Sequence, residues 1–264
     1  NPESDPRYDE YWRGYHEIMR REGVSPDLAR TIIRTNSTVI ASMMMHRGEA
    51  DAMICGTYGH YAWHVGHVLD VIGKAEGVRD VSALSCLIVN KGTFFMCDTH
   101  VTHDPSMEEI VETTIMGADA VRRFGLEPKV ALISHSNFGN DTTPTAIKMR
   151  EAVKILRERV PDLEVDGEMH ADAALDQANR DRVFPGSCLT GVANLLVFPN
   201  LEAANGAFNL LKAAGDGLPV GPLLVGAAKP VHVVTTSISA RGLVNMSALA
   251  VVDAQARQNQ GTFL

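Results

Sequence analysis

Short aliphatic runs alternate with longer amphipathic segments along most of the chain. A short aliphatic run is typical of a buried strand, whereas apolar residues three and four apart are typical of a helix packed along one face. Their alternation predicts an α/β protein whose mainly parallel sheet is covered by helices on both faces. The predicted strands are 51–56, 83–89, 93–97, 129–134, 163–166, 195–198, 222–225 and 231–235. The predicted helices are 9–22, one that begins at Pro26, 37–46, 106–124, 145–159, 171–179, 202–213 and 240–254.

Several local signals fix the ends of these elements. Ser25 before Pro26 is a helix N-cap followed by the residue preferred at the first helical position. Ser106 and Glu109 have the spacing of a capping box, so a helix should begin there. The segment 90–92 (Asn-Lys-Gly) predicts a tight turn that joins strands 83–89 and 93–97 as a hairpin.

Composition narrows the class of protein. The 264 residues are 45% hydrophobic and 21% charged, which is ordinary for a globular protein, and the net charge of −8 argues against a nucleic-acid-binding surface. No apolar run is long enough to cross a membrane, so we expect neither a nucleic-acid nor a membrane partner. Four cysteines form no CxxC pair, and we expect reduced thiols in a cytoplasmic protein. The chain begins at Asn1 rather than Met, and we expect it to be a piece of something longer.

The first candidate site is the polar loop that follows strand 129–134. Hydroxyls, a glycine and a helix start favour an anion at the carboxyl end of a parallel strand. A solvated turn is the alternative. The candidate side chains are Ser134, His135, Ser136 and Asn137.

The second candidate is a set of histidines. His60, His64 and His67 are four and three residues apart and would share a helix face, with His100 and His103 further along. Three imidazoles could hold zinc. No HExxH motif or dedicated carboxylate accompanies them, so we expect a polar helix face or hydrogen-bonded core histidines, and no metal.

The third candidate is the hydroxyl-rich segment 235–242, which follows Lys229 and could line a pocket or simply connect a strand to a helix. No GxSxG elbow is present, which argues against a serine hydrolase.

Four segments in this order resemble the phosphate acetyl/butyryltransferase (phosphotransacetylase) family through nearly the whole chain. They are 131–136 (ALISHS), 166–174 (DGEMHADAA), 193–203 (ANLLVFPNLEA) and 221–231 (GPLLVGAAKPV). The segments 5–12, 47–57 and 134–139 resemble, more closely still, the C-terminal domain of bacterial NADP-dependent malic enzymes. There a phosphotransacetylase-like domain follows the malate-oxidising part.

This resemblance implies a two-lobed, three-layer α/β/α fold like that of isocitrate and isopropylmalate dehydrogenases. Lobe one would comprise 1–113 plus 225–264 and lack its first strand–helix units, and lobe two would comprise 114–224. The resemblance also implies a homo-oligomer, at least a dimer.

The departures from active family members are chemical. After Lys-Pro-Val, active members carry a catalytic Ser, Arg and Asp, and the aligned residues are Thr235, Thr236 and Gly242. An arginine that binds anionic substrate aligns with Gly66, and a neighbouring Asp aligns with Trp63. Acetyl transfer needs a base for the CoA thiol and a cation for the phosphate. Because Gly66, Thr236 and Gly242 supply neither, we expect no catalytic residue and no transferase activity.

We therefore expect a regulatory domain that binds acetyl-CoA as an allosteric effector. The part it regulates would be the malic enzyme catalytic domain of the same chain, which converts malate to pyruvate and CO2. The domain would hold no cofactor, because NADP and a divalent metal would belong to the upstream part. One alternative is an active phosphate acetyltransferase with His60 or His64 as base, and another is a purely structural oligomerisation module. The expected acetyl-CoA contacts are Ser134, His135, Ser136, Asn137, Thr57, Tyr58, Lys229 and Thr235.

Overall fold

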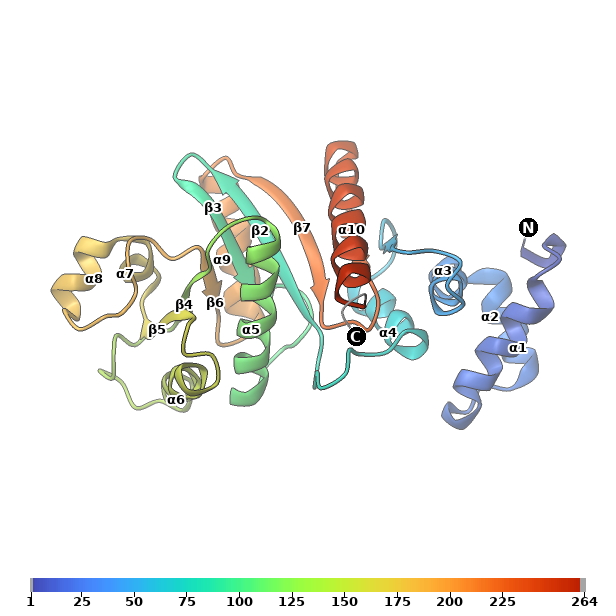
Figure 1. The fold of residues 1–264 in the computed structure, drawn as a ribbon, viewed down its shortest axis with the longest axis horizontal. Coiled ribbons are helices and arrows are strands. Elements are labelled where there is room, and N and C mark those ends of the chain that lie inside the picture. Colours follow the sequence, from blue (N-terminus) through green and yellow to red (C-terminus); the bar gives the residue numbers. More distant parts are fainter. Residues whose placement is uncertain (1, 262–264) are drawn as a thin grey trace. The chain divides into compact units, whose positions relative to one another are not determined.

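Six strands between residues 82 and 225 join into one sheet in the computed structural model, which describes residues 2–261 (Figure 1). The strands are β2 (Ser82–Val89), β3 (Gly92–Cys97), β4 (Lys129–Ile133), β5 (Glu164–Met169), β6 (Leu195–Val197) and β7 (Leu218–Val225). Their order is β5-β4-β6-β3-β2-β7. β5, β4, β6 and β3 pair in parallel, while β2 is antiparallel to both β3 and β7. The predicted mainly parallel α/β sheet is therefore confirmed, with β2 running against the other strands.

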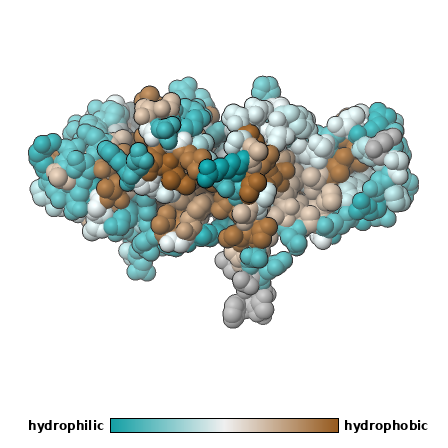
Figure 2. Space-filling model, turned by 90° about the horizontal axis from the view of Figure 1, so that it is seen from above, coloured by the Kyte–Doolittle hydropathy of each residue, from teal (hydrophilic) through white to brown (hydrophobic). Residues whose placement is uncertain are grey.

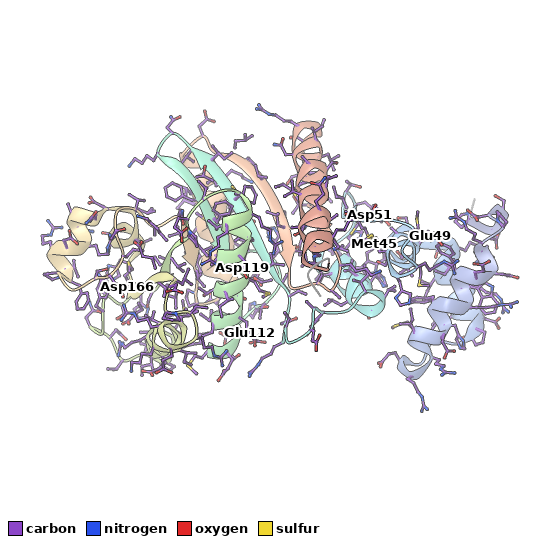
Figure 3. The ribbon with its side chains drawn as sticks, viewed as in Figure 1. Met45, Glu49, Asp51, Glu112, Asp119 and Asp166 are labelled. Atoms are coloured by element: carbon purple, nitrogen blue, oxygen red, sulfur yellow. The ribbon has the colours of Figure 1, made fainter. Side chains whose placement is uncertain are left out.

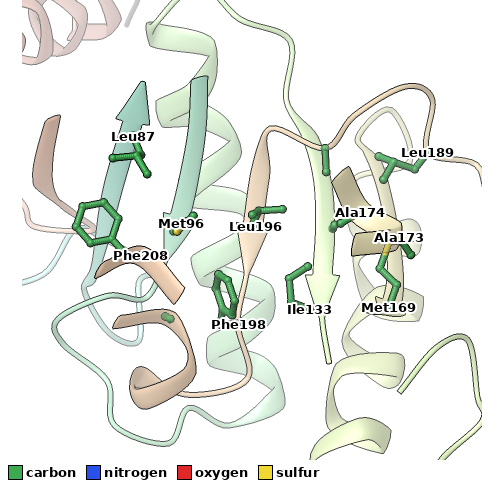
Figure 4. Packing of buried hydrophobic residues seen from close by; sticks show 13 residues of the cluster. Leu87, Met96, Ile133, Met169, Ala173, Ala174, Leu189, Leu196, Phe198 and Phe208 are labelled. Atoms are coloured by element: carbon green, nitrogen blue, oxygen red, sulfur yellow. The ribbon is translucent and has the colours of Figure 1, made fainter. Parts of the chain in front are cut away.

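Helices cover both faces of this sheet. They are α5 (Met107–Arg123), α6 (Pro144–Arg159), α7 (Ala171–Leu175), α8 (Gln177–Val183) and α9 (Leu201–Ala214). Successive side chains of a strand point to opposite faces, and β6 shows the result. Leu195 lies beside Gly117 of α5, whereas Leu196 joins the core formed with α7 and α9 (Figure 4). That core also contains Phe208 of α9 and Ala174 of α7.

The remaining elements come from both ends of the chain. They are α1 (Tyr8–Met19), α2 (Pro26–Thr35), α3 (Ser37–His46), β1 (Met53–Cys55), α4 (Tyr61–Val71), β8 (Val231–Val233) and α10 (Ala240–Gly261), with short 3-10 turns at Pro2–Ser4 and Arg20–Glu22. β1 and β8 pair in parallel as a separate two-stranded sheet. α1 to α3 pack around the side chains of Tyr15, Ile33 and Met43, together with Val71 of α4.

The chain divides into two compact units, each with its own core. Unit 1 comprises Asn1–Gly77 and Ala227–Leu264, and unit 2 comprises Val78–Gly226. The predicted boundary between 113 and 114 falls inside α5. The unit boundary lies earlier, at Gly77, because β2 and β3 pair with β7 and β6 and so belong to unit 2. Position 1 and positions 262–264 of the predicted lobe one lie outside the described residues.

The surface is mixed in polarity. Figure 2 shows apolar patches among hydrophilic side chains on the face in view. Among the described residues, no helix combines the length and the apolar character that crossing a membrane requires.

Candidate functional site

The carboxyl edge of the unit 2 sheet carries a pocket of about 500 Å³. It opens where β4 and β6 end side by side and where α6 and α9 begin. Such an edge is where parallel α/β sheets bind ligands, because loops and helix N-termini converge there. The lining side chains are neutral apart from one histidine: Ile133, Ser134, His135, Thr143, Thr145, Phe198, Pro199, Asn200 and Ala203.

A buried carboxylate holds the loop that borders this pocket. Glu168, near the end of β5, is fully buried. Its Oε1 accepts hydrogen bonds from Ser136 Oγ at 2.6 Å, from the Gly139 amide at 3.0 Å and from Arg150 Nη2 at 2.8 Å. Arg150 Nε donates to Oε2 at 3.0 Å, which completes a bidentate ion pair with α6. The backbone carbonyl of Glu168 accepts a further hydrogen bond from the Phe138 amide at 2.7 Å.

The electrostatics of this group favour the ionised form. Burial alone would raise the pKa of the Glu168 carboxyl, but the hydrogen bonds from Arg150 and Ser136 outweigh burial and lower it. The same carboxylate raises the pKa of Arg150. The loop is therefore tied to a carboxylate whose ionised form the ion pair with Arg150 favours.

The four predicted loop residues do not share one orientation. Ser134 and His135 line the pocket. Ser136 is fully buried and donates to Glu168, and it lies within 3.0 Å of Asn140 Oδ1. Asn137 accepts a hydrogen bond from the His170 amide through Oδ1 at 2.8 Å. Ser136 and Asn137 thus support the loop from inside.

His135 is the one ionisable side chain among the pocket residues. Its Nε2 lies 3.3 Å from Thr143 Oγ1 and 3.6 Å from Asp141 Oδ1, and its side chain is 56% exposed. Its backbone carbonyl is bonded to His170 Nε2 at 2.7 Å. The ring can therefore meet a ligand while its backbone is held.

A second set of predicted residues gathers at the carboxyl edge of the β1–β8 sheet in unit 1. Thr57 and Tyr58 follow β1, Thr235 follows β8, and the two strands are parallel partners. Gly56 permits this approach, because a Cβ at that position would lie 2.2 Å from the Val234 carbonyl oxygen. Thr57 and Tyr58 are exposed.

Lys229 lies elsewhere. It precedes β8, at the opposite end of the strand from Thr235. Its Nζ donates to the carbonyl of Met45 at 2.5 Å and lies 3.4 Å from that of His46, at the C-terminus of α3. The structure thus gives the ammonium a helix end as its partner and separates it from the residues with which it was grouped.

The three positions at which the family resemblance placed catalytic groups carry no acid, base or cation here. Gly66 is an exposed glycine on α4 with open space where a side chain would stand. Thr236 is exposed, and Gly242 lies in the first turn of α10 with its amide bonded to Ser239 Oγ at 3.0 Å. None of these residues can take up a proton from a thiol or supply a positive charge.

The predicted histidine face divides. His60 is the exposed N-cap of α4. His64 is buried, with Nδ1 2.8 Å from Thr38 Oγ1 and Nε2 2.5 Å from the Tyr58 carbonyl oxygen. His67 contacts the ring of Trp63 edge-on at 4.6 Å. His100 and His103 belong to unit 2. Within residues 2–261, no three His, Cys, Asp or Glu side chains are grouped so that they could hold a metal ion.

Sequence reasoning missed Glu168 and Arg150. Glu168 sits inside a segment already singled out, at 166–174, and a carboxylate flanked by strand residues was the signal available. Such a residue must find a cation when it is buried. The partner lies on a different element, 18 positions away, which the sequence pattern does not indicate.

Comparisons with known proteins agree with this architecture. The family model described as "Phosphate acetyl/butaryl transferase" matches residues 1–251. The chain is 53% identical over 253 residues to the NAD-dependent malic enzyme of Rhizobium meliloti (strain 1021), covering 96% of this chain and 33% of that protein. It is 52% identical over 256 residues to the NADP-dependent malic enzyme of Escherichia coli (strain K12), covering 97% and 34%.

Phosphotransacetylases match at lower identity. The phosphate acetyltransferase of Nitratidesulfovibrio vulgaris is 30% identical over 257 residues, covering 97% of this chain and 36% of that protein. A solved phosphotransacetylase from Streptococcus pyogenes superposes with a TM-score of 0.88 at 27% identity, covering 98% of this chain and 78% of that one.

The chain spans about a third of the length of the malic enzymes it matches. Both the resemblance found in the sequence and the predicted phosphotransacetylase-like α/β/α fold are confirmed. With a family model covering 1–251, the chain belongs to the phosphate acetyl/butaryl transferase family.

Proposed function

We propose that this chain is the C-terminal phosphotransacetylase-like domain of a malic enzyme, that it binds acetyl-CoA as an allosteric effector, and that it does not transfer the acetyl group. The similarity to malic enzymes at above 50% identity, compared with about 30% for a phosphate acetyltransferase, supports the choice of parent protein. The relatives include both an NAD-dependent and an NADP-dependent enzyme, so the dinucleotide is left open.

The observation that carries the absence of transfer is the chemistry at Gly66, Thr236 and Gly242. Attack of a CoA thiol on acetyl phosphate requires removal of the thiol proton and stabilisation of charge on the phosphate. Losing one such group typically costs about 10²–10³ in rate. Here the base position and two cation positions are all replaced.

Retention of a binding site is what an effector domain requires. Allosteric control depends on unequal affinity for two states of the protein and needs no turnover. The unit 2 pocket, bordered by a loop that an ion pair holds in place, supports binding. We propose Ser134 and His135 as contacts in unit 2, and Thr57, Tyr58 and Thr235 in unit 1.

The domain would also help to assemble the protein as a homo-oligomer. The dinucleotide and divalent metal of malate oxidation would be held by the rest of the protein, since this chain spans only about a third of the malic enzymes it matches. Malate oxidation to pyruvate and CO2 would then proceed outside this chain, under its control.

The test is a calorimetric titration of the full-length protein and of this chain with acetyl-CoA, free CoA and acetyl phosphate in parallel. We expect acetyl-CoA to bind and to change the rate of malate oxidation by the full-length protein. A coupled assay for acetyl-CoA formation from acetyl phosphate should show no activity above background, with His60→Ala and His64→Ala as controls.

Two results would contradict the proposal. Turnover of acetyl phosphate that is lost in either histidine variant would make the chain a transferase. Absence of acetyl-CoA binding to the full-length protein, combined with disassembly when the domain is removed, would make it a structural module.

A further inference from the structure

The loop 134–140 is anchored by Glu168, together with two hydrogen bonds to His170 and one from the Ser134 amide to the Met169 carbonyl. Of its backbone amides, that of Gly139 donates to the Glu168 carboxylate and that of Phe138 to the Glu168 carbonyl. The Ser136 hydroxyl donates to the same carboxylate. The loop therefore has three bonds to a single residue on β5.

These bonds decide which side chains reach the pocket. Because Ser136 turns inward onto Glu168, its neighbours Ser134 and His135 are left on the pocket side. The backbone amide of Ser136 donates to Ser134 Oγ at 3.1 Å, so the Ser134 hydroxyl is held by the backbone of the same loop. Arg150 completes the arrangement from α6, donating to both oxygens of Glu168 and to the Asp141 carbonyl just beyond the loop.

We infer that Glu168 is a positioning residue for effector binding. Ser136 serves to link the loop to Glu168 through its hydroxyl and is not an acetyl-CoA contact. This inference rests on the proposed function and names the group that sets the geometry of its unit 2 site. Glu168 touches no ligand itself. Its ion pair with Arg150 holds Ser134 and His135 in the arrangement that binds, so that the loop is ordered before the ligand arrives.

Unit 2 offers a matched control on the same strand. Asp166 is 2% exposed and pairs with Arg157 Nη2 at 2.6 Å (Figure 3 labels Asp166). It accepts hydrogen bonds from Ser187 Oγ and the Cys188 amide, so it fixes a different loop that does not line the pocket. Asp166 and Glu168 are therefore two buried carboxylates with one arginine each, and only Glu168 is connected to the pocket.

The experiment compares Glu168→Gln with Asp166→Asn in the full-length protein. Each amide keeps the shape of the side chain but removes its negative charge and places an N–H group beside a guanidinium, so the ion pair is lost. We measure the dissociation constant of acetyl-CoA by calorimetry and hydrogen–deuterium exchange of the peptide containing 134–140. Glu168→Gln should raise the dissociation constant about tenfold to a hundredfold and speed loop exchange at least about tenfold, whereas Asp166→Asn should do neither.

A milder variant keeps the test informative if Glu168→Gln folds poorly. Ser136→Ala leaves the Arg150–Glu168 pair intact and removes only the hydrogen bond from the Ser136 hydroxyl to Glu168. It should therefore raise the dissociation constant and speed loop exchange by less than Glu168→Gln does. Loop exchange and acetyl-CoA affinity in Glu168→Gln that match those of Asp166→Asn would overturn the inference. If the unmodified protein binds no acetyl-CoA, the proposed function fails, while the exchange comparison still decides whether Glu168 orders the loop.

Discussion

Polar side chains in both units are hydrogen-bonded to partners that lie far along the chain. Glu168 bonds to Ser136, 32 positions earlier, and Lys229 bonds to Met45, 184 positions earlier. These contacts fix which side chains remain available to a ligand. At the residue scale the structure therefore gives Ser136 and Lys229 partners within the protein, and it adds Glu168 and Arg150, which were not predicted.

A partly buried histidine gives a pH-dependent prediction at this scale. His100 follows β3, with Nδ1 2.9 Å from Thr99 Oγ1. Burial, with a smaller effect from the charge of Lys212, lowers its pKa to about 4. In the unfolded chain a histidine titrates near 6.5. As the pH falls below about 6.5, the unfolded state therefore binds a proton at this residue, whereas the folded state does not until the pH approaches about 4.

The stability that neutral His100 contributes should thus be complete above about pH 6.5 and lost between about 6.5 and 4. Over that range the free energy of unfolding should fall by up to about 3 kcal/mol from this group. Urea unfolding at several pH values checks this, and His100→Gln should flatten the dependence. Equal slopes in the original protein and His100→Gln would refute the assignment.

The position of the candidate loop could be predicted from the sequence, but its hydrogen-bond partners could not. The loop 134–137 was found because polar residues follow a buried strand, and that signal is local. The inward turn of Ser136 depends on Glu168, and the role of Lys229 depends on the end of α3. Neither partner is near in sequence, so no spacing pattern could reveal these contacts.

At the scale of elements, sequence signals with a local cause succeeded. Ser106 and Glu109 form the predicted capping box at the start of α5, with Glu109 Oε2 2.6 Å from the Ser106 amide. β2 and β3 form the predicted hairpin. The single helix predicted at 171–179 is instead two, because Asp176 has an extended backbone and caps α8 through its side chain. The antiparallel pairing of β7 with β2 depends on distant residues and was not predicted.

The end of α3 provides a prediction for Lys229, close to Met45 (labelled in Figure 3). A cation at a helix C-terminus stabilises the helix by about 0.3–1 kcal/mol, and a charged hydrogen bond adds to this. Lys229→Met keeps the aliphatic stem, so it should lower the free energy of unfolding by about 1 kcal/mol, measured by urea unfolding. The acetyl-CoA dissociation constant should change less than twofold.

The opposite pattern for Lys229→Met would be informative. A dissociation constant raised at least about tenfold with unchanged stability would place the ammonium on the effector, as the sequence alone suggested.

At the scale of the whole molecule, the two units differ in how they are built from the chain. Unit 2 is one continuous segment that contains all six strands of its sheet and the core on α7 and α9. Unit 1 needs two segments, because β1 pairs with β8 from beyond unit 2. Two lobes with a discontinuous first lobe were expected from the family resemblance, while the boundaries depend on strand pairing.

Unit 2 should therefore fold as an isolated fragment. A polypeptide of residues 78–226 is expected to show native-like far-UV circular dichroism and a single cooperative unfolding transition. The matched fragment 2–77 lacks β8 and should show no cooperative transition that includes β1. A fragment 78–226 without cooperative unfolding would mean that unit 2 depends on unit 1 for its stability.

The discontinuity of unit 1 has a consequence during synthesis. A ribosome adds about 5–20 residues per second and releases the N-terminal residues first. The helices α1 to α3 can pack as soon as Val71 of α4 emerges, since their common core lies within that stretch. β1, however, must wait with its backbone unpaired until all of unit 2 has been translated and β8 appears. Any chain truncated before Val231 would lack β8 and leave the backbone of β1 unpaired, so we expect quality-control proteases to cleave such chains there.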